Sequence, residues 1–204
     1  MSTAAIRKAI AEACRTEAST NGLRHRFAEH LDDLGRRLTL PVEQPAEALV
    51  DFTRRYIQFV PEFIDEITLH CEDQVTLAYL NMAEDFFLAP PTPVAEEEGL
   101  MALLDEAFLA QRVLEELNDR LLRFRGRPLL PLDMTRANII VHHLIGDRLA
   151  SRLEALIEQC LSLLWDNAHR FAQPPEAGLV DRDWWDQLPC MSRDANIDLR
   201  LEVV

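Results

Sequence analysis

A helical hydrophobic period runs almost unbroken through the middle of the chain. Its apolar residues fall three or four positions apart, which is the spacing of one face of an α-helix and not the alternation of a strand. This stripe consists of Leu49, Phe52, Tyr56, Phe59, Phe63, Ile67, Cys71, Val75, Ala78, Met82 and Phe86. Similar periods flank it on both sides. The sequence therefore predicts an all-α protein, a multi-helix bundle of about six or seven helices.

Prolines, glycines and capping residues divide the chain into helical segments. The third segment contains Pro61, where we expect a kink or the start of a new helix, because proline disrupts a helix interior. The expected helices span residues 3–19, 23–38, 46–88, 93–124, 133–144, 147–171 and 181–188. Their apolar faces should meet in one core, in which we expect to find buried together Phe63, Ile67, Leu104, Phe108, Leu114, Leu156 and Leu163.

The end of the chain has a different pattern. Apolar and charged residues alternate from Ile197 to Val203, the period of a half-buried strand, which places Ile197, Leu199, Leu201 and Val203 on one face. We therefore expect one helical domain over residues 1–188 and an extended tail over residues 189–204. A helical bundle offers no obvious sheet edge, so the tail should pair with another chain, either in an antiparallel homodimer or on a partner's sheet. The alternative is a tail that packs loosely on its own helices.

Composition excludes several classes of function. The formal net charge of −14 disfavours nucleic acid as a partner, because an acidic surface repels phosphate. The sequence has no run of about 18 apolar residues, so we expect no membrane span. It also lacks the apolar region of a signal peptide, and its four cysteines are scattered. These features together favour a cytoplasmic protein without disulfides.

No metal, cofactor or catalytic motif is recognisable. A di-metal site in a helical bundle needs two Glu-x-x-His pairs and further carboxylates, and the one acidic match here is Asp166 with His169. The sequence lacks a nucleophile elbow, a dinucleotide-binding glycine pattern and a phosphate-binding loop. We therefore assign no catalytic residue, no metal ligand and no cofactor.

Two adjacent pairs remain as candidate functional residues. His142 and His143 lie near the end of a predicted helix, where they could form a polar site or simply favour the negative end of the helix dipole. Trp184 and Trp185 follow a loop, and one indole could anchor a partner while the other packs on the bundle. With the alternating residues of the tail, the tryptophans are the candidate partner-binding residues.

Three functions remain open. The leading hypothesis is a helical protein-interaction module, such as an adaptor, regulator, chaperone-like binder or inhibitor, because the acidic chain lacks catalytic motifs and ends in a strand-like tail. The first alternative is a small-ligand-binding bundle with an interhelical pocket lined by Phe, Met and His. The second alternative is a carboxylate/histidine metal-dependent enzyme.

Overall fold

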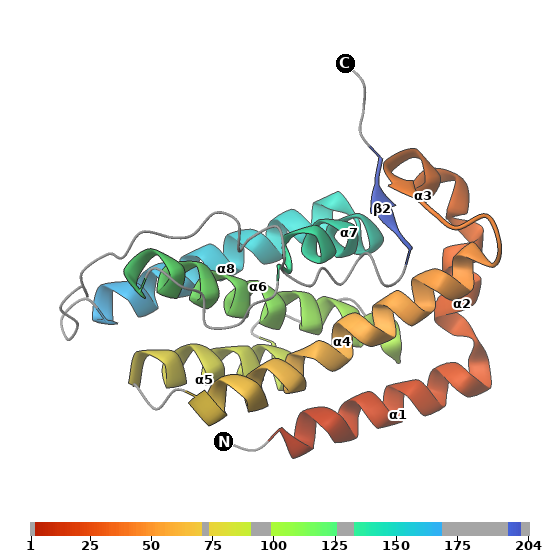
Figure 1. Ribbon diagram of the computed structural model, residues 1–204. Helices are drawn as coiled ribbons and strands as arrows, with labels where there is room; N and C mark the ends of the chain where they lie inside the picture. The colour runs from red at the N-terminus through yellow and green to blue at the C-terminus, as the bar shows by residue number, and fades with distance from the viewer. Residues whose placement is uncertain (1–2, 71–73, 91–98, 126–132, 169–195, 201–204) are drawn as a thin grey trace.

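The computed structural model describes residues 3–70, 74–90, 99–125, 133–168 and 196–200. Within these residues the chain forms eight helices and one two-stranded antiparallel sheet, which confirms the predicted all-α class (Figure 1). The elements are α1 (Ala4–Thr20), α2 (Gly22–Glu29), α3 (Leu31–Arg37), β1 (Leu38–Thr39), α4 (Pro45–His70), α5 (Gln74–Leu88), α6 (Leu100–Arg125), α7 (Thr135–Ile145), α8 (Asp147–Ala168) and β2 (Asp198–Leu199).

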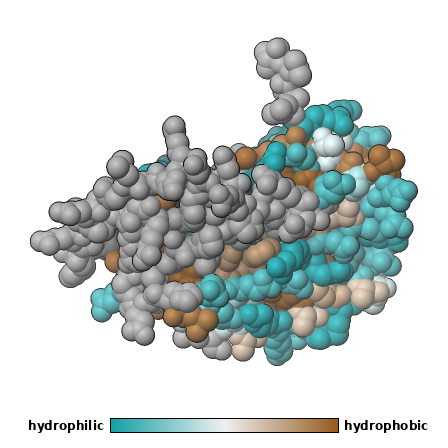
Figure 2. Space-filling model, viewed as in Figure 1, coloured by the Kyte–Doolittle hydropathy of each residue, from teal (hydrophilic) through white to brown (hydrophobic). Residues whose placement is uncertain are grey.

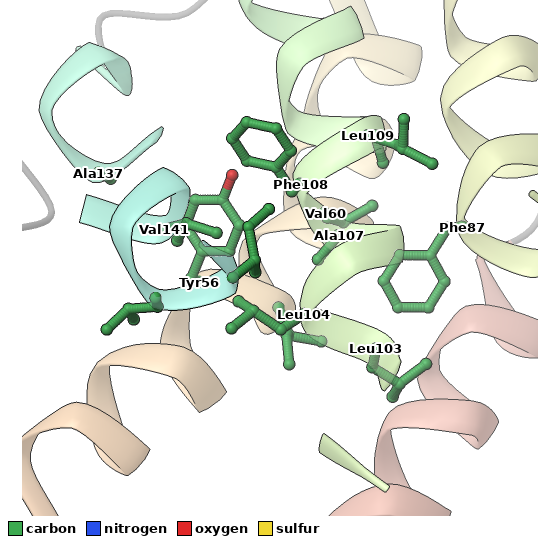
Figure 3. Close-up of a cluster of buried hydrophobic side chains, with 14 of the residues drawn as sticks. Tyr56, Val60, Phe87, Leu103, Leu104, Ala107, Phe108, Leu109, Ala137 and Val141 are labelled. Carbon is green, nitrogen blue, oxygen red and sulfur yellow. The ribbon is translucent and has the colours of Figure 1, made fainter. Parts of the chain in front are cut away.

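Helix α6 lies at the centre of the bundle. It packs against α1, α4 and α5 on one side and against α7 and α8 on the other (Figure 1). Its first half is apolar almost all round, as expected for a helix that is enclosed by others. Figure 3 shows Leu104 and Phe108 of α6 facing Tyr56 of α4 and Val141 of α7. The core of the protein is therefore built around this helix.

The long apolar stripe forms two helices, α4 and α5, and not one continuous segment. Pro61 lies inside α4, and the helix runs past it from Pro45 to His70. A proline in a helix interior costs about 3 kcal/mol or more. Val60 and Ile64 on either side of it are fully buried, and burial of such side chains offsets this cost. Of the two expectations at Pro61, the start of a new helix is therefore wrong. The stripe marks the buried face of α4, whereas in α5 the fully buried face runs mainly through Tyr79, Leu80, Ala83 and Phe87.

The helix predicted over residues 23–38 is also two helices, α2 and α3. The main chain bends at His30, whose N–H donates a hydrogen bond to the Phe27 carbonyl at 3.1 Å, a tighter turn than an α-helix makes. Helix α3 then ends at Arg37, and Leu38 is extended, with φ −119° and ψ 142°. This early end leaves Leu38 and Thr39 available as a short strand.

The predicted core is largely correct. Phe63, Ile67, Leu104, Phe108 and Leu114 are buried, and Leu156 is half-buried. Leu163 is an exception, because its side chain is 61% exposed. The buried stripe of α8 runs through Leu153, Ile157 and Leu161. Leu163 lies two positions after Leu161, about 200° further round the helix, and so faces away from the core.

Most of the described surface on the face shown in Figure 2 is hydrophilic, with apolar residues visible in strips between helices. The large apolar side chains that stay exposed lie on separate elements, including Val42 before α4, Leu69 at the end of α4 and Leu163 on α8. No helix among the described residues is both long enough and apolar enough to span a bilayer. The start of the expected helix 93–124, residues 93–98, and the whole of the expected helix 181–188 lie outside the described residues.

Candidate functional site

The C-terminal strand docks on its own chain. Strand β2 pairs antiparallel with β1, with Leu199 opposite Leu38 and Asp198 opposite Thr39. The N–H of Arg200 extends this pairing by donating a hydrogen bond to the carbonyl of Arg37 at 2.8 Å. In Figure 1, β2 lies beside α3 and close to α7 at one end of the bundle.

Two side chains anchor this strand. Ile197, immediately before it, is only 1% exposed and belongs to the hydrophobic core of the bundle. Asp198 forms an ion pair with Arg136 of α7, with a distance of 2.6 Å between the guanidinium nitrogen and the carboxylate. Leu199 is partly buried against the same core. We use the name strand-docking edge for the surface that receives β2. It consists of β1, Arg136 of α7 and the part of the hydrophobic core that encloses Ile197.

This arrangement corrects the sequence-based expectation for the tail. The alternation predicted a strand over Ile197–Val203, and the described part of it, residues 198–199, pairs with Leu38–Thr39 of the same chain. Ile197 and Leu199, expected to bind a partner, pack on their own core. The premise that the bundle offers no sheet edge is wrong, because α3 ends at Arg37 and the extended residues after it provide one. Leu201, Val203, Trp184 and Trp185 lie outside the described residues.

The predicted histidine pair lies in a polar cluster next to this edge. His142 and His143 occupy the last turn of α7, which ends at Ile145 and is followed by Gly146 with a φ of 89°. His142 Nδ1 is 3.3 Å from Glu154 Oε1 of α8, and its Nε2 is 3.6 Å from Asp147 Oδ1. His143 Nδ1 is 3.6 Å from the same oxygen of Asp147. Both rings therefore converge on the carboxylate that begins α8.

Arg37 at the end of α3 completes this cluster. Its Nη1 lies 2.5 and 2.6 Å from the two carboxylate oxygens of Asp147 and 3.3 Å from His143 Nδ1. The hydrogen bond from Arg37 lowers the pKa of Asp147 below its usual 3.8. Burial and then the positive charge of Arg37 lower the pKa of His143 below 6.5. The cluster therefore favours an ionised Asp147 and a neutral His143.

A second polar centre, which the sequence did not predict, lies inside the bundle. The Tyr56 hydroxyl donates to Asn138 Oδ1 at 2.5 Å, and Asn138 Nδ2 donates to Glu115 Oε2 at 2.7 Å. Glu115 also accepts a hydrogen bond from Arg112. The Gln111 amide donates to the Tyr56 carbonyl at 3.2 Å. This network links α4, α6 and α7 through groups that would be costly to bury unpaired.

The chemistry of this network is structural. Burial and then the carboxylate of Glu115 raise the pKa of Tyr56 well above 10.0. The phenol therefore stays protonated and acts as a hydrogen-bond donor, with Asn138 as the acceptor. One sequence signal was available, since Asn138 is a polar residue between the apolar Ala137 and Ile140 on the inner face of α7.

Two observations on the described residues concern the alternative functions. They contain no group of three or more His, Cys, Asp or Glu side chains placed to hold a metal ion. Hollows of about 460, 260 and 300 Å³ lie beside the start of α8, between α2 and α4, and between α1, α2 and α6. All three open to solvent at helix ends, and a phenylalanine lines none of them.

Comparison with known proteins identifies neither the fold family nor the site. The function of the strand-docking edge and of the histidine cluster therefore has to follow from their own contacts. No protein-family model, no curated protein and no solved structure matches the chain.

Proposed function

We propose that this protein is a non-catalytic interaction module that holds an extended segment of a partner protein as a strand on the strand-docking edge. The observation that supports this function is the docking of β2 on a bundle of helices. Main-chain pairing, an apolar anchor and a charge contact are the interactions by which β-strand addition recognises a peptide. The C-terminal segment occupies the edge until a partner displaces it.

The contacts of β2 define the chemistry of the partner segment. Its first anchor is a branched apolar residue in the place of Ile197, because that side chain is enclosed by the core. Its next residue is acidic, because Arg136 pairs with Asp198 at this position. An apolar residue in the place of Leu199 follows. The partner segment therefore alternates apolar and acidic residues, and a basic residue opposite Arg136 is rejected by like-charge repulsion.

Displacement is feasible because the pairing is short within the described part of the chain. The two strands pair at two positions, Leu38 with Leu199 and Thr39 with Asp198. The Arg136–Asp198 pair is also largely exposed, and ion pairs of this kind contribute at most about 1 kcal/mol. A partner segment that forms a longer ladder or presents a larger apolar anchor therefore competes with β2. The ordering cost of the partner segment makes this binding reversible.

The test is a binding titration with a fluorescent peptide of residues 196–204. The receptor is the full chain with Ile197→Asp, a substitution that removes the apolar anchor of its own strand. We expect this variant to bind the peptide at least about tenfold more tightly than the wild-type chain, because β2 no longer competes.

Two controls define the specificity of the titration. A peptide with Ile197→Asp should not bind, and a receptor with Leu163→Asp, a similar substitution at an exposed position, should behave as wild type. Failure of the native peptide to bind the Ile197→Asp receptor would show that the edge does not accept a strand from solution. Equal binding of both peptides would show that recognition does not use the Ile197 contact.

A further inference from the structure

We propose that protonation of His143 releases the C-terminal strand, so that acidic conditions open the strand-docking edge. The release concerns the protein's own strand, while its consequence for a partner rests on the proposed function. The structural basis is Arg37. The guanidinium of this residue contacts His143, and its main-chain carbonyl accepts the hydrogen bond from Arg200 next to β2.

The contact with Arg37 favours a neutral His143. A guanidinium only donates hydrogen bonds, so a hydrogen bond between Arg37 Nη1 and His143 Nδ1, which lie 3.3 Å apart, has the ring nitrogen as its acceptor. An imidazole nitrogen accepts only when it carries no proton, which places the ring proton on Nε2. In this state Arg37 is held by His143 Nδ1 and by the Asp147 carboxylate together. Residues 37–39 are thereby fixed in the position that receives β2.

Protonation at Nδ1 changes each of these interactions. The nitrogen no longer accepts from Arg37, and two positive groups then lie 3.3 Å apart. The new N–H points to a competing acceptor, Asp147 Oδ1, which is 3.6 Å away and already holds Arg37. Arg37 consequently loses His143 Nδ1 as an acceptor and has to share the Asp147 carboxylate with the new N–H. The Arg37 side chain therefore moves. Its carbonyl is the acceptor for Arg200, so the strand loses a hydrogen bond.

The other histidine of the cluster does not have this role. His142 contacts Asp147 and Glu154, both from α8, and neither contact depends on an unprotonated ring nitrogen facing a cation. A positive charge on His142 adds repulsion toward His143, because the two ring centroids are 5.8 Å apart. The effect of His142 is therefore secondary to the loss of the acceptor at His143.

The charged groups on the remaining elements lie further from this contact. On α3, Arg36 forms an ion pair with Asp33. On the strand side, Asp198 is paired with Arg136 of α7, and Arg200 is exposed. None of these pairs involves His143.

The direction of the pH effect follows from linkage. Burial and Arg37 lower the pKa of His143 below 6.5 in the docked state, against the opposing effect of Asp147. In the proposed released state Arg37 has moved away, and the pKa of His143 returns toward 6.5. The released state therefore binds the proton more tightly. The stabilisation of the docked strand is complete above about 6.5 and is lost as the pH falls from there through the lowered value.

The experiment measures the hydrogen-exchange protection factor of the Arg200 amide by NMR in the full chain at about pH 7.5 and about pH 5. A protection factor divides out the intrinsic pH dependence of exchange and reports local opening. We expect Arg200 to lose at least about threefold in protection at the lower pH, while the Leu109 amide in the core of α6 keeps its value. His143→Asn should abolish this loss, because its side-chain oxygen is an acceptor that does not titrate.

A matched variant and a binding assay distinguish the outcomes. His142→Gln should retain the pH response, and a response lost equally in both variants would refute the assignment to His143. Unchanged Arg200 protection between the two pH values would refute the switch. The proposed function is tested separately by peptide binding to the Ile197→Asp chain at about pH 7.5, where His143 is neutral. The result of the peptide titration is independent of the result of the exchange measurement, so the two proposals can fail separately.

Discussion

Two buried tyrosines allow the energetic role of the internal polar network to be measured with one atom removed at a time. Tyr56 and Tyr79 are both fully buried, on α4 and α5. The Tyr56 hydroxyl donates to Asn138 Oδ1 at 2.5 Å. The Tyr79 hydroxyl has no hydrogen-bond partner among the described residues. Tyr56→Phe and Tyr79→Phe therefore remove the same group from a paired and from an unpaired position.

The expected change in unfolding free energy depends on whether the substitution leaves a neighbouring polar atom buried without a partner. Tyr56→Phe leaves Asn138 Oδ1 buried without its donor, which costs about 1–3 kcal/mol of unfolding free energy. Tyr79→Phe removes a hydroxyl that is buried without a protein partner in the described structure, so no bond is lost. We expect a change within about 0.5 kcal/mol, or a gain in stability, because an unpaired buried hydroxyl is itself unfavourable.

The stability of both variants is measured by urea unfolding, with circular dichroism as the signal. With a slope of about 2 kcal/mol per molar urea, a loss of about 2 kcal/mol lowers the midpoint by about 1 M. The two variants should share the wild-type slope, so that midpoints can be compared directly. Equal losses in the two variants, or a larger loss for Tyr79→Phe, would refute the assignment of the network as a stabilising element.

Three further predictions concern the core and the pH dependence of stability. Phe108→Ala should cost about 3–5 kcal/mol in the same urea assay, because the ring is fully buried on α6. Leu161→Ala should cost about 2–5 kcal/mol and Leu163→Ala less than about 1 kcal/mol, since the first side chain is 5% and the second 61% exposed. Burial raises the pKa of Glu106 from 4.5 to about 7, so the folded state binds this proton more tightly than the unfolded state. Stability should therefore fall as the pH rises from about 4.5 through about 7, and Glu106→Gln should remove that part of the pH dependence.

The helical fold was predictable because each helix has its own apolar face. The stripe that begins at Leu49 indicated the buried face of α4 directly, since side chains three and four apart share a face. In α5 the stripe residues Val75 and Met82 are only half-buried, and the core face includes Tyr79 and Leu80 instead. The ends of the helices were less predictable. Pro61 is a strong local signal for a break, but burial of its neighbours keeps α4 continuous. The bend at His30 has no proline or glycine to indicate it.

The candidate site was only partly predictable because its parts lie far apart in the sequence. The alternation of apolar and charged residues indicated the C-terminal strand. The sequence also contained signals for the segment that pairs with it. Leu40 precedes Pro41, which biases it toward an extended conformation, and Thr39 is β-branched. The histidine pair was identified, but Arg37 lies 106 residues from His143, and no local pattern connects them. Tyr56 and Asn138 are separated by 82 residues for the same reason.

A disulfide across the two strands tests most directly whether a partner segment and β2 use the same edge. The register places Thr39 opposite Asp198, and facing residues of antiparallel strands have Cα separations that a disulfide spans. In the full chain with Thr39→Cys and Asp198→Cys, oxidation fixes β2 in place, and reduction frees a strand that has lost its contact with Arg136. We predict that the reduced chain binds the peptide of residues 196–204 at least about tenfold more tightly than the oxidised chain. Equal affinity in the two redox states would contradict the account, because the peptide would then bind away from the edge that β2 occupies.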